Sequence, residues 1–227
     1  MQSIKVFLVS FIKMIRLHQW VKNLLIFLPI LLAGVTAHSS FLLTLKGFIA
    51  FSLIASSFYV FNDLNDIHED REHPEKKNRP IAANEVSKLL AKFCFLILFI
   101  SGISISLSLN IEFQSTIVAY CLLNILYSRH LKYYAILDLL VVTSFYTIRL
   151  IGGALLNNLV ISNWLITFSV FFFLFLAIIK RRVELYNSDK VNINAGKYRK
   201  EDMPFLSQLS VFSGLISVLV ICLYIDS

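Results

Sequence analysis

The sequence predicts an all-α integral membrane protein, built as a bundle of about seven transmembrane helices in one domain over residues 1–227. The composition is the first reason, since 57% of the residues are hydrophobic and 15% are charged, whereas roughly a quarter of a soluble domain is charged. The second reason is that the apolar residues form separate runs, near the length of about 20 residues that a helix needs to cross a bilayer. The third is that the basic residues gather between alternate runs, as they do in the cytoplasmic loops of membrane proteins.

Seven apolar runs are candidate spans, and the fourth is the shortest. They cover residues 21–37, 41–61, 89–109, 113–127, 135–156, 160–179 and 206–225. Before the first run, residues 1–20 mix apolar side chains with Lys5, Lys13 and Arg16, which predicts an amphipathic helix lying in the membrane interface. A cleaved signal peptide is the alternative, and the lack of a small-residue cleavage site argues against it.

The distribution of basic residues predicts the orientation in the membrane. With the N-terminus inside, 19 of the 21 Lys and Arg residues lie on the inner side. They stand in the N-terminal segment through Lys22, in the segment after the second span through Lys92, and in the loops after the fourth and sixth spans. The exceptions are Lys46, near the outer interface, and Arg149, within the fifth span. This bias predicts a cytoplasmic N-terminus and a multi-pass protein of the cell (inner) membrane. It also accounts for the net charge of +7 without nucleic acid as a partner.

A row of acidic residues follows the second span. Asp63, Asp66 and Asp70 stand at i, i+3 and i+7, so they share one face if the span continues as a helix. Carboxylates stacked in this way repel one another, and a bound cation would remove that cost. Magnesium is usually held by one or two carboxylates, with water and substrate phosphates as the other ligands. The row therefore predicts a magnesium site for a phosphorylated substrate, and a solvated acidic helix end is the alternative.

The loop after this row is basic and contains two prolines. Lys76 and Arg79 lie within ten residues of Asp70, where they are suited to bind phosphate oxygens that the metal does not hold. Pairing with the carboxylates or with lipid headgroups is the alternative. Pro74 and Pro80 restrict the backbone of this loop, which favours a shaped site.

The fifth span contains two ionisable residues, Asp138 and Arg149. Such residues are costly inside a bilayer and usually face a cavity or a partner. Asp138 lies near the cytoplasmic end, close in sequence to Arg129 and Lys132, and we expect it to belong to the site. For the deeper Arg149 we expect either a lipid phosphate or a carboxylate of another helix as the partner.

Four motifs in collinear order carry a resemblance to a known family. Asn62-Asp63-x-x-Asp66-x-x-x-Asp70, followed by His73-Pro74-x-Lys76-x-x-Arg79-Pro80, resembles the first signature of the UbiA-type membrane prenyltransferase superfamily. The other three are Arg16-x-His18-Gln19-Trp20-Val21-Lys22-Asn23-Leu24, then Tyr127-Ser128-x-x-Leu131-Lys132 with Asp138, and Lys180-Arg181-Arg182-x-Glu184-Leu185. Together they are most similar to the branch of decaprenyl-phosphate phosphoribosyltransferase-like proteins.

The resemblance implies a helical bundle with a cavity that opens toward the cytoplasm and the membrane. Asp63, Asp66 and Asp70 would be catalytic and would hold Mg²⁺ and a diphosphate-bearing donor. In this branch the donor would be phosphoribosyl diphosphate, the acceptor a polyprenyl phosphate, and pyrophosphate would leave. The family fold usually has nine helices, so a chain with seven is either truncated at the C-terminus or a reduced member. The sequence is compatible with a homo-oligomer.

Two alternatives remain beside this expectation. An aromatic prenyltransferase would carry a second aspartate-rich motif after the sixth span. That region instead contains Lys180, Arg181, Arg182, Glu184 and a solitary Asp189, which favours phosphate binding over a second magnesium site. A transporter is the non-enzyme alternative, but its charges would lie near the midplane of the membrane, whereas these concentrate at one face. The candidate substrate-binding residues are Lys22, Asn62, Lys76, Arg79, Arg129, Lys132, Asp138, Arg149, Lys180, Arg181 and Glu184.

Overall fold

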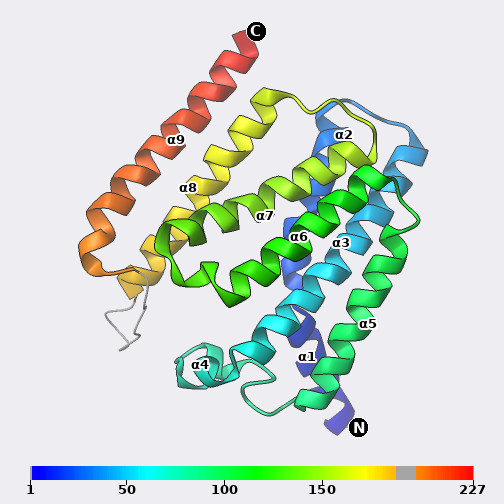
Figure 1. Ribbon diagram of the computed structural model, residues 1–227, viewed down its shortest axis with the longest axis vertical. Helices are drawn as coiled ribbons and strands as arrows, with labels where there is room; N and C mark the ends of the chain where they lie inside the picture. The colour runs from blue at the N-terminus through cyan, green and yellow to red at the C-terminus, as the bar shows by residue number, and fades with distance from the viewer. Residues whose placement is uncertain (1, 188–197, 227) are drawn as a thin grey trace.

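A computed structural model describes residues 2–187 and 198–226, and every regular element in these ranges is a helix (Figure 1). The order is α1 (Gln2–Ile15), η1 (Leu17–Phe27), α2 (Leu28–Leu32), α3 (His38–Asn65), α4 (Ile67–Glu72), η2 (Lys76–Asn78), α5 (Lys88–Ser106), α6 (Ile111–Arg129), η3 (Leu131–Tyr133), α7 (Ala135–Leu156), α8 (Asn163–Asn187), η5 (Lys200–Asp202) and α9 (Met203–Asp226). The predicted all-α class is confirmed.

Five segments are long and apolar enough to cross a membrane, which supports a multi-pass membrane protein. They contain α3, α5, α7, α8 and α9. A sixth is obtained if Val9–Ile15 and Leu17–Leu32, which meet at a bend of 40°, count as one broken span. The predicted number of seven is therefore not confirmed. The predicted span 113–127 lies in α6, whose apolar character is diluted by polar residues such as Glu112, Gln114 and Asn124.

The N-terminal region is divided by a bend between α1 and η1. α1 ends at Ile15, and the next residue, Arg16, has a left-handed backbone with φ of 55°. Met14 and Ile15 are buried against the end of α3, so one face of α1 packs on the bundle. The predicted span 21–37 is the 3₁₀ segment η1 followed by the short α2.

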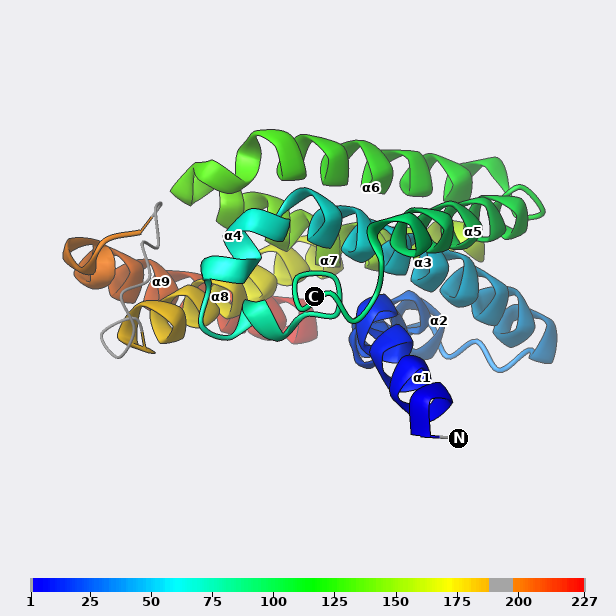
Figure 2. The same cartoon turned by 90° about the horizontal axis from the view of Figure 1, so that it is seen from below.

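α3 is the central helix, and it contacts α1, η1, α5, α6 and α7. Its buried Phe51, Ile54 and Phe58 form the core with Phe113 and Ile117 of α6. Seen from below, α6 lies along one side of the bundle and α1 with α2 along the other, with α3 and α7 between them (Figure 2). This arrangement leaves α8 against α7, and α9 against α8 at the edge of the bundle (Figure 1).

Candidate active site

Polar segments that are far apart in the sequence meet at one end of the bundle. α3, α6 and α8 end there, and α4 and α7 begin there (Figure 1). Side-chain contacts join these ends: Lys132 after α6 reaches Asp66, and Arg181 of α8 reaches Asp138 of α7. The Ser128 hydroxyl of α6 donates to the Oδ1 atom of Asn62 in α3. The predicted site residues of the loops and helix ends are thus brought together by antiparallel helix packing.

The helix that carries the acidic row is broken, which differs from the expected continuous face. α3 ends at Asn65, and Asp66 has φ −97° and ψ 13° before α4 begins at Ile67. A backbone hydrogen bond from Asp70 N–H to the carbonyl oxygen of Asp66, at 2.8 Å, bridges this break between α3 and α4. As a result Asp63 and Asp70 share one cationic partner, whereas Asp66 has another.

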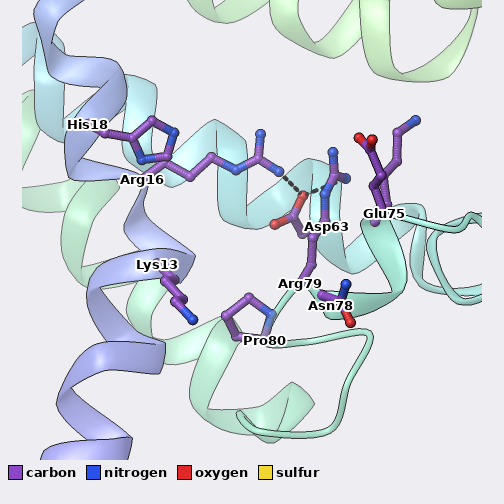
Figure 3. A pocket seen from close by; sticks show the side chains of 9 residues that line it. Lys13, Arg16, His18, Asp63, Glu75, Asn78, Arg79 and Pro80 are labelled. Atoms are coloured by element: carbon purple, nitrogen blue, oxygen red, sulfur yellow. Dashed lines mark hydrogen bonds and ion pairs between the residues drawn. The ribbon is translucent and has the colours of Figure 1, made fainter. Parts of the chain in front are cut away.

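Asp63 and Asp70 are buried carboxylates that share one arginine, and each is only 2% exposed. The Nη1 atom of Arg79 lies 3.1 Å from Asp63 Oδ1 and 2.8 Å from Asp70 Oδ2. Arg16 adds a second guanidinium to Asp63, with Nη2 2.5 Å from the same Oδ1 (Figure 3). Burying a carboxylate without a partner costs several kcal/mol, so these arginines are what permits the two acids to be buried.

Asp66 faces a different cation, the Lys132 amine of η3, at 2.6 Å. The carboxylate of Glu69 is a second, more distant partner of the same amine, at 3.8 Å. Burial alone would lower the pKa of Lys132, but the hydrogen bond and the charge of Asp66 outweigh it, and the pKa is raised. Lys132 is therefore a full positive charge at neutral pH, directly beside the acidic row.

The carboxylate oxygens of the acidic row are suitable ligands for magnesium. In this structure the carboxylates are paired instead with the side chains of Arg16, Arg79 and Lys132. Among the described residues, no group of three His, Cys, Asp or Glu side chains is arranged as a metal-binding cluster. However, the Arg79 nitrogen bonded to both Asp63 and Asp70 shows that the two acids lie close enough to contact one cation together. Carboxylate oxygens are hard ligands, and magnesium commonly takes one or two of them together with substrate phosphates.

Asp63 also lines a cavity of about 340 Å³ (Figure 3). Its charged lining comes from α1, η1 and the loop around η2: Lys13, Arg16, Asp63, Glu75, Lys76 and Arg79. Of the predicted substrate-binding residues, Lys76 and Arg79 thus lie at this cavity. Arg16 and Arg79 form the wall that the cavity shares with the acidic row, because both donate to Asp63.

A second ionic cluster joins α7 to α8. Asp138 is fully buried and accepts from Tyr127 Oη at 2.7 Å and from Arg181 Nε at 2.7 Å. Arg181 also donates to Glu184, and Lys180 lies 3.8 Å from the same carboxylate. These predicted substrate-binding residues therefore contact one another, and the cluster couples the two helices. Arg129 is exposed at the end of α6.

Arg149 lies deep in the bundle among neutral and aromatic partners. Its Nε donates to Asn23 Oδ1 at 2.6 Å, and its guanidinium carbon lies 5.0 Å from the centre of the Phe51 ring. Of the two expected partners, a carboxylate of another helix is not found among the described residues, and a lipid phosphate stays a prediction. Lys22, on the neighbouring η1, places its amine 5.9 Å from the centre of the Tyr146 ring.

Three residues at the site were not assigned a role by the sequence argument: Arg16, Tyr127 and Ser128. Each contacts a predicted site residue, namely Asp63, Asp138 and Asn62. The available signal was their position inside the motifs that carried the resemblance. Asp189, the isolated acid after the sixth predicted span, lies outside the described residues.

Comparison with known proteins gives a consistent result. A sequence model of the UbiA prenyltransferase family matches residues 23–224. The uncharacterized protein y4nM of Sinorhizobium fredii is 36% identical over 215 residues, which are 93% of this chain and 42% of y4nM. Decaprenyl-phosphate phosphoribosyltransferase of Mycobacterium tuberculosis is 33% identical over 184 residues, 79% of this chain and 61% of that enzyme. The chain therefore spans less than two thirds of either relative.

The fold also matches a solved structure. A UbiA homologue from Archaeoglobus fulgidus, bound to GPP and Mg²⁺, superposes with a TM-score of 0.76 at 15% sequence identity. The match covers 94% of this chain and 78% of the homologue. At this identity the likeness establishes the shared helical fold.

Proposed function

The chain belongs to the UbiA prenyltransferase family, and from this membership we propose that it is a magnesium-dependent phosphoribosyltransferase. It transfers a 5-phosphoribosyl group from phosphoribosyl diphosphate to a polyprenyl phosphate, with release of pyrophosphate. The observation that carries the proposal is the charge pattern of the second half of the site. Its acids Asp138 and Glu184 both pair with Arg181. Lys180 and Arg182 add two further positive charges in the same stretch, and such a basic cluster suits additional phosphate oxygens better than a second magnesium ion.

The acidic row is the proposed donor site. Asp63, Asp66 and Asp70 would hold Mg²⁺, which when bound offsets the negative charge of the diphosphate leaving group. Their present partners Arg16, Arg79 and Lys132 stand next to the row. Released from the carboxylates, these cations would bind phosphate oxygens, as charge-assisted hydrogen bonds favour. The same cations would thus offset the negative charge of the acids in the empty site and part of the charge of the phosphates in the loaded site.

The reaction needs little acid–base chemistry from the protein. The bond from ribose C1 to the diphosphate oxygen breaks, and an oxygen of the acceptor phosphate forms the new bond to C1. The ionised phosphate is already nucleophilic, so no strong general base is required. The contribution of the protein is to position the two substrates and to stabilise the developing charge.

We place this site on the cytoplasmic side of the cell (inner) membrane. The loops that carry Lys76, Arg79, Lys132 and Lys180 are rich in basic residues, and such loops remain on the cytoplasmic side. A polyprenyl lipid would reach the site from the bilayer, and the water-soluble donor from the cytoplasm.

The proposal is tested by a transfer assay on the purified chain. Radiolabelled phosphoribosyl diphosphate and a polyprenyl phosphate are incubated with Mg²⁺, with and without EDTA, and label is counted in the lipid phase. We expect label that EDTA abolishes. A parallel reaction with a polyprenyl diphosphate and an aromatic acceptor tests the alternative prenyl transfer. Activity only in that second reaction would overturn the proposal.

A further inference from the structure

The cavity beside Asp63 has an excess of positive charge that the acidic row does not use. Four cations, Lys13, Arg16, Lys76 and Arg79, line it together with only two carboxylates, Asp63 and Glu75. Arg16 and Arg79 are engaged by Asp63. In the described part of the chain, Lys13 and Lys76 have no ion pair. The lining of the cavity therefore favours the binding of an anion.

The cavity lies next to the acidic row. Asp63 belongs to the row and also lines the cavity. Arg16 and Arg79 point toward Asp63, whereas the Lys13 side chain points toward Pro80 (Figure 3). A ligand in the cavity would thus lie against the same guanidinium groups as a diphosphate at the row. Its volume of about 340 Å³ lies at the lower end of the range for small-molecule sites.

We propose that this cavity binds the 5-phosphate of the donor, and that Lys13 and Lys76 determine its specificity for a phosphoribosyl over a prenyl diphosphate. The inference rests on the proposed function. Phosphoribosyl diphosphate is anionic at both ends, while a prenyl diphosphate carries an apolar chain in place of the second phosphate. A second cationic cavity next to the diphosphate site is useful only for the first of these donors.

A phosphate group reaches such a cavity either on a soluble ligand or on a lipid headgroup. α1 exposes Val9 and Ile12 close to Lys13, so an anionic lipid lying along this helix would present the same chemistry. The two sources differ in their response to added lipid, which the experiment uses.

The test measures binding of labelled ribose 5-phosphate, phosphoribosyl diphosphate and Mg²⁺-pyrophosphate to the purified full chain in a non-ionic detergent. The double variant Lys13→Ala/Lys76→Ala removes the two cations without an ion pair. The matched control Lys77→Ala/Lys88→Ala removes two exposed cations that do not line the cavity. Asp66→Asn alters the acidic row without touching the cavity lining.

We expect the first double variant to weaken ribose 5-phosphate and phosphoribosyl diphosphate at least about tenfold, the loss associated with a charged hydrogen bond. Its affinity for Mg²⁺-pyrophosphate should stay within about twofold of the wild type. Asp66→Asn should weaken Mg²⁺-pyrophosphate and phosphoribosyl diphosphate, and its affinity for ribose 5-phosphate should stay within about twofold of the wild type. The control pair should bind all three ligands like the wild type.

Three results would overturn the inference. Equal weakening of ribose 5-phosphate and pyrophosphate would show a general charge effect. Displacement of ribose 5-phosphate by phosphatidylglycerol, with the same dependence on Lys13 and Lys76, would assign the cavity to a lipid headgroup. Unchanged binding of phosphoribosyl diphosphate to the double variant would show that the cavity does not bind the donor, and it would leave the proposed function unaffected. Failure of the wild type to bind that donor, beside binding of geranyl diphosphate, would instead overturn the proposed function itself.

Discussion

At the scale of single residues, the site is governed by buried acids that depend on arginine. Asp63 receives hydrogen bonds from Arg16 and Arg79, and Asp70 from Arg79 alone. Removing one member of a buried ion pair is destabilising, because the other charge stays in a medium that solvates it poorly. The same carboxylates are the proposed ligands of magnesium, so stability and activity are linked at these positions.

Asp63→Asn separates these two contributions. We expect turnover to fall at least about 100-fold, the usual loss when one charge-stabilising group is removed. The amide can still accept a hydrogen bond from Arg16, so we expect a stability loss of only about 1–3 kcal/mol. The transfer assay and thermal unfolding in detergent measure the two effects. Glu69→Gln is the control, because the Glu69 side chain is 66% exposed and its Oε2 atom lies 3.8 Å from the Lys132 amine. Full activity of the Asp63→Asn protein would contradict the assignment of Asp63 to the metal site.

His73 provides a prediction about pH. Its Nδ1 atom accepts from the backbone N–H groups of Glu75 and Lys76, at 3.2 and 3.4 Å, which requires an unprotonated nitrogen. Burial, and then the charge of Lys76, lower the pKa of His73 below its usual value of 6.5. Because the folded state prefers the neutral form, this stabilisation is complete above the unfolded pKa of about 6.5 and is lost as the pH falls below it.

The measurement is a titration of the histidine ring signals by NMR in detergent, with His73→Gln used to assign the resonance. We expect the His73 signal to titrate below the ordinary range for histidine. A midpoint at or above about 6.5 would show that the two backbone bonds do not hold the neutral ring.

At the scale of elements, glycine allows helices to approach closely. A Cβ atom on Gly153 of α7 would lie 2.0 Å from the backbone oxygen of Ile26 in η1. A Cβ atom on Gly102 of α5 would lie 3.0 Å from the backbone oxygen of Ala50 in α3. Small residues permit such contacts between membrane helices, where packing replaces the hydrophobic effect as the driving force.

Gly153→Ala should therefore separate η1 from α7 and displace Asn23 from Arg149. We expect a loss of about 1–3 kcal/mol, the usual cost of overpacking, and a lower unfolding temperature in detergent. Gly214→Ala is the matched control, because its Cβ would meet only the movable Phe175 ring, at 3.3 Å. Equal unfolding temperatures for the two variants would mean that η1 shifts without cost.

At the scale of the whole molecule, the helix packing gathers the polar ends on one side. Asp66 and Lys132 come from positions 66 residues apart, and Asp138 and Arg181 from positions 43 apart. The basic loops lie at this same end, so the fold and the charge bias agree on a single site-bearing face.

Cysteine labelling tests the orientation of this face. Cys94, Cys121 and Cys222 are first replaced by alanine, and single cysteines are introduced at Lys77 and at His38, which lie at opposite ends of α3 and its following loop. In intact cells, a membrane-impermeant maleimide should label His38→Cys and spare Lys77→Cys until the membrane is opened. The opposite pattern would place the site outside the cytoplasm.

The sequence by itself determined the helical class and the position of the polar helix ends, and the metal chemistry of the acidic row stays a prediction. These follow from local properties: apolar runs near 41–61, 135–156 and 206–225 exclude water-exposed structure, and their basic flanks stay on one side of a bilayer. The sequence did not determine the number of spans. η1 and α6 mix apolar and polar residues, and composition alone does not show whether such a segment crosses the membrane.

Only the tertiary structure decided which charges meet. The break at Asp66 separates one acid of the row from the other two, and Arg79 contacts both acids of that pair. Arg149 binds Asn23 across 126 positions of sequence, where a carboxylate of another helix was one of the two expected partners. The physical reason is that a buried charge is stabilised by whatever polar group the packing brings within about 3 Å, and helix packing, unlike helix formation, is not encoded within any one segment.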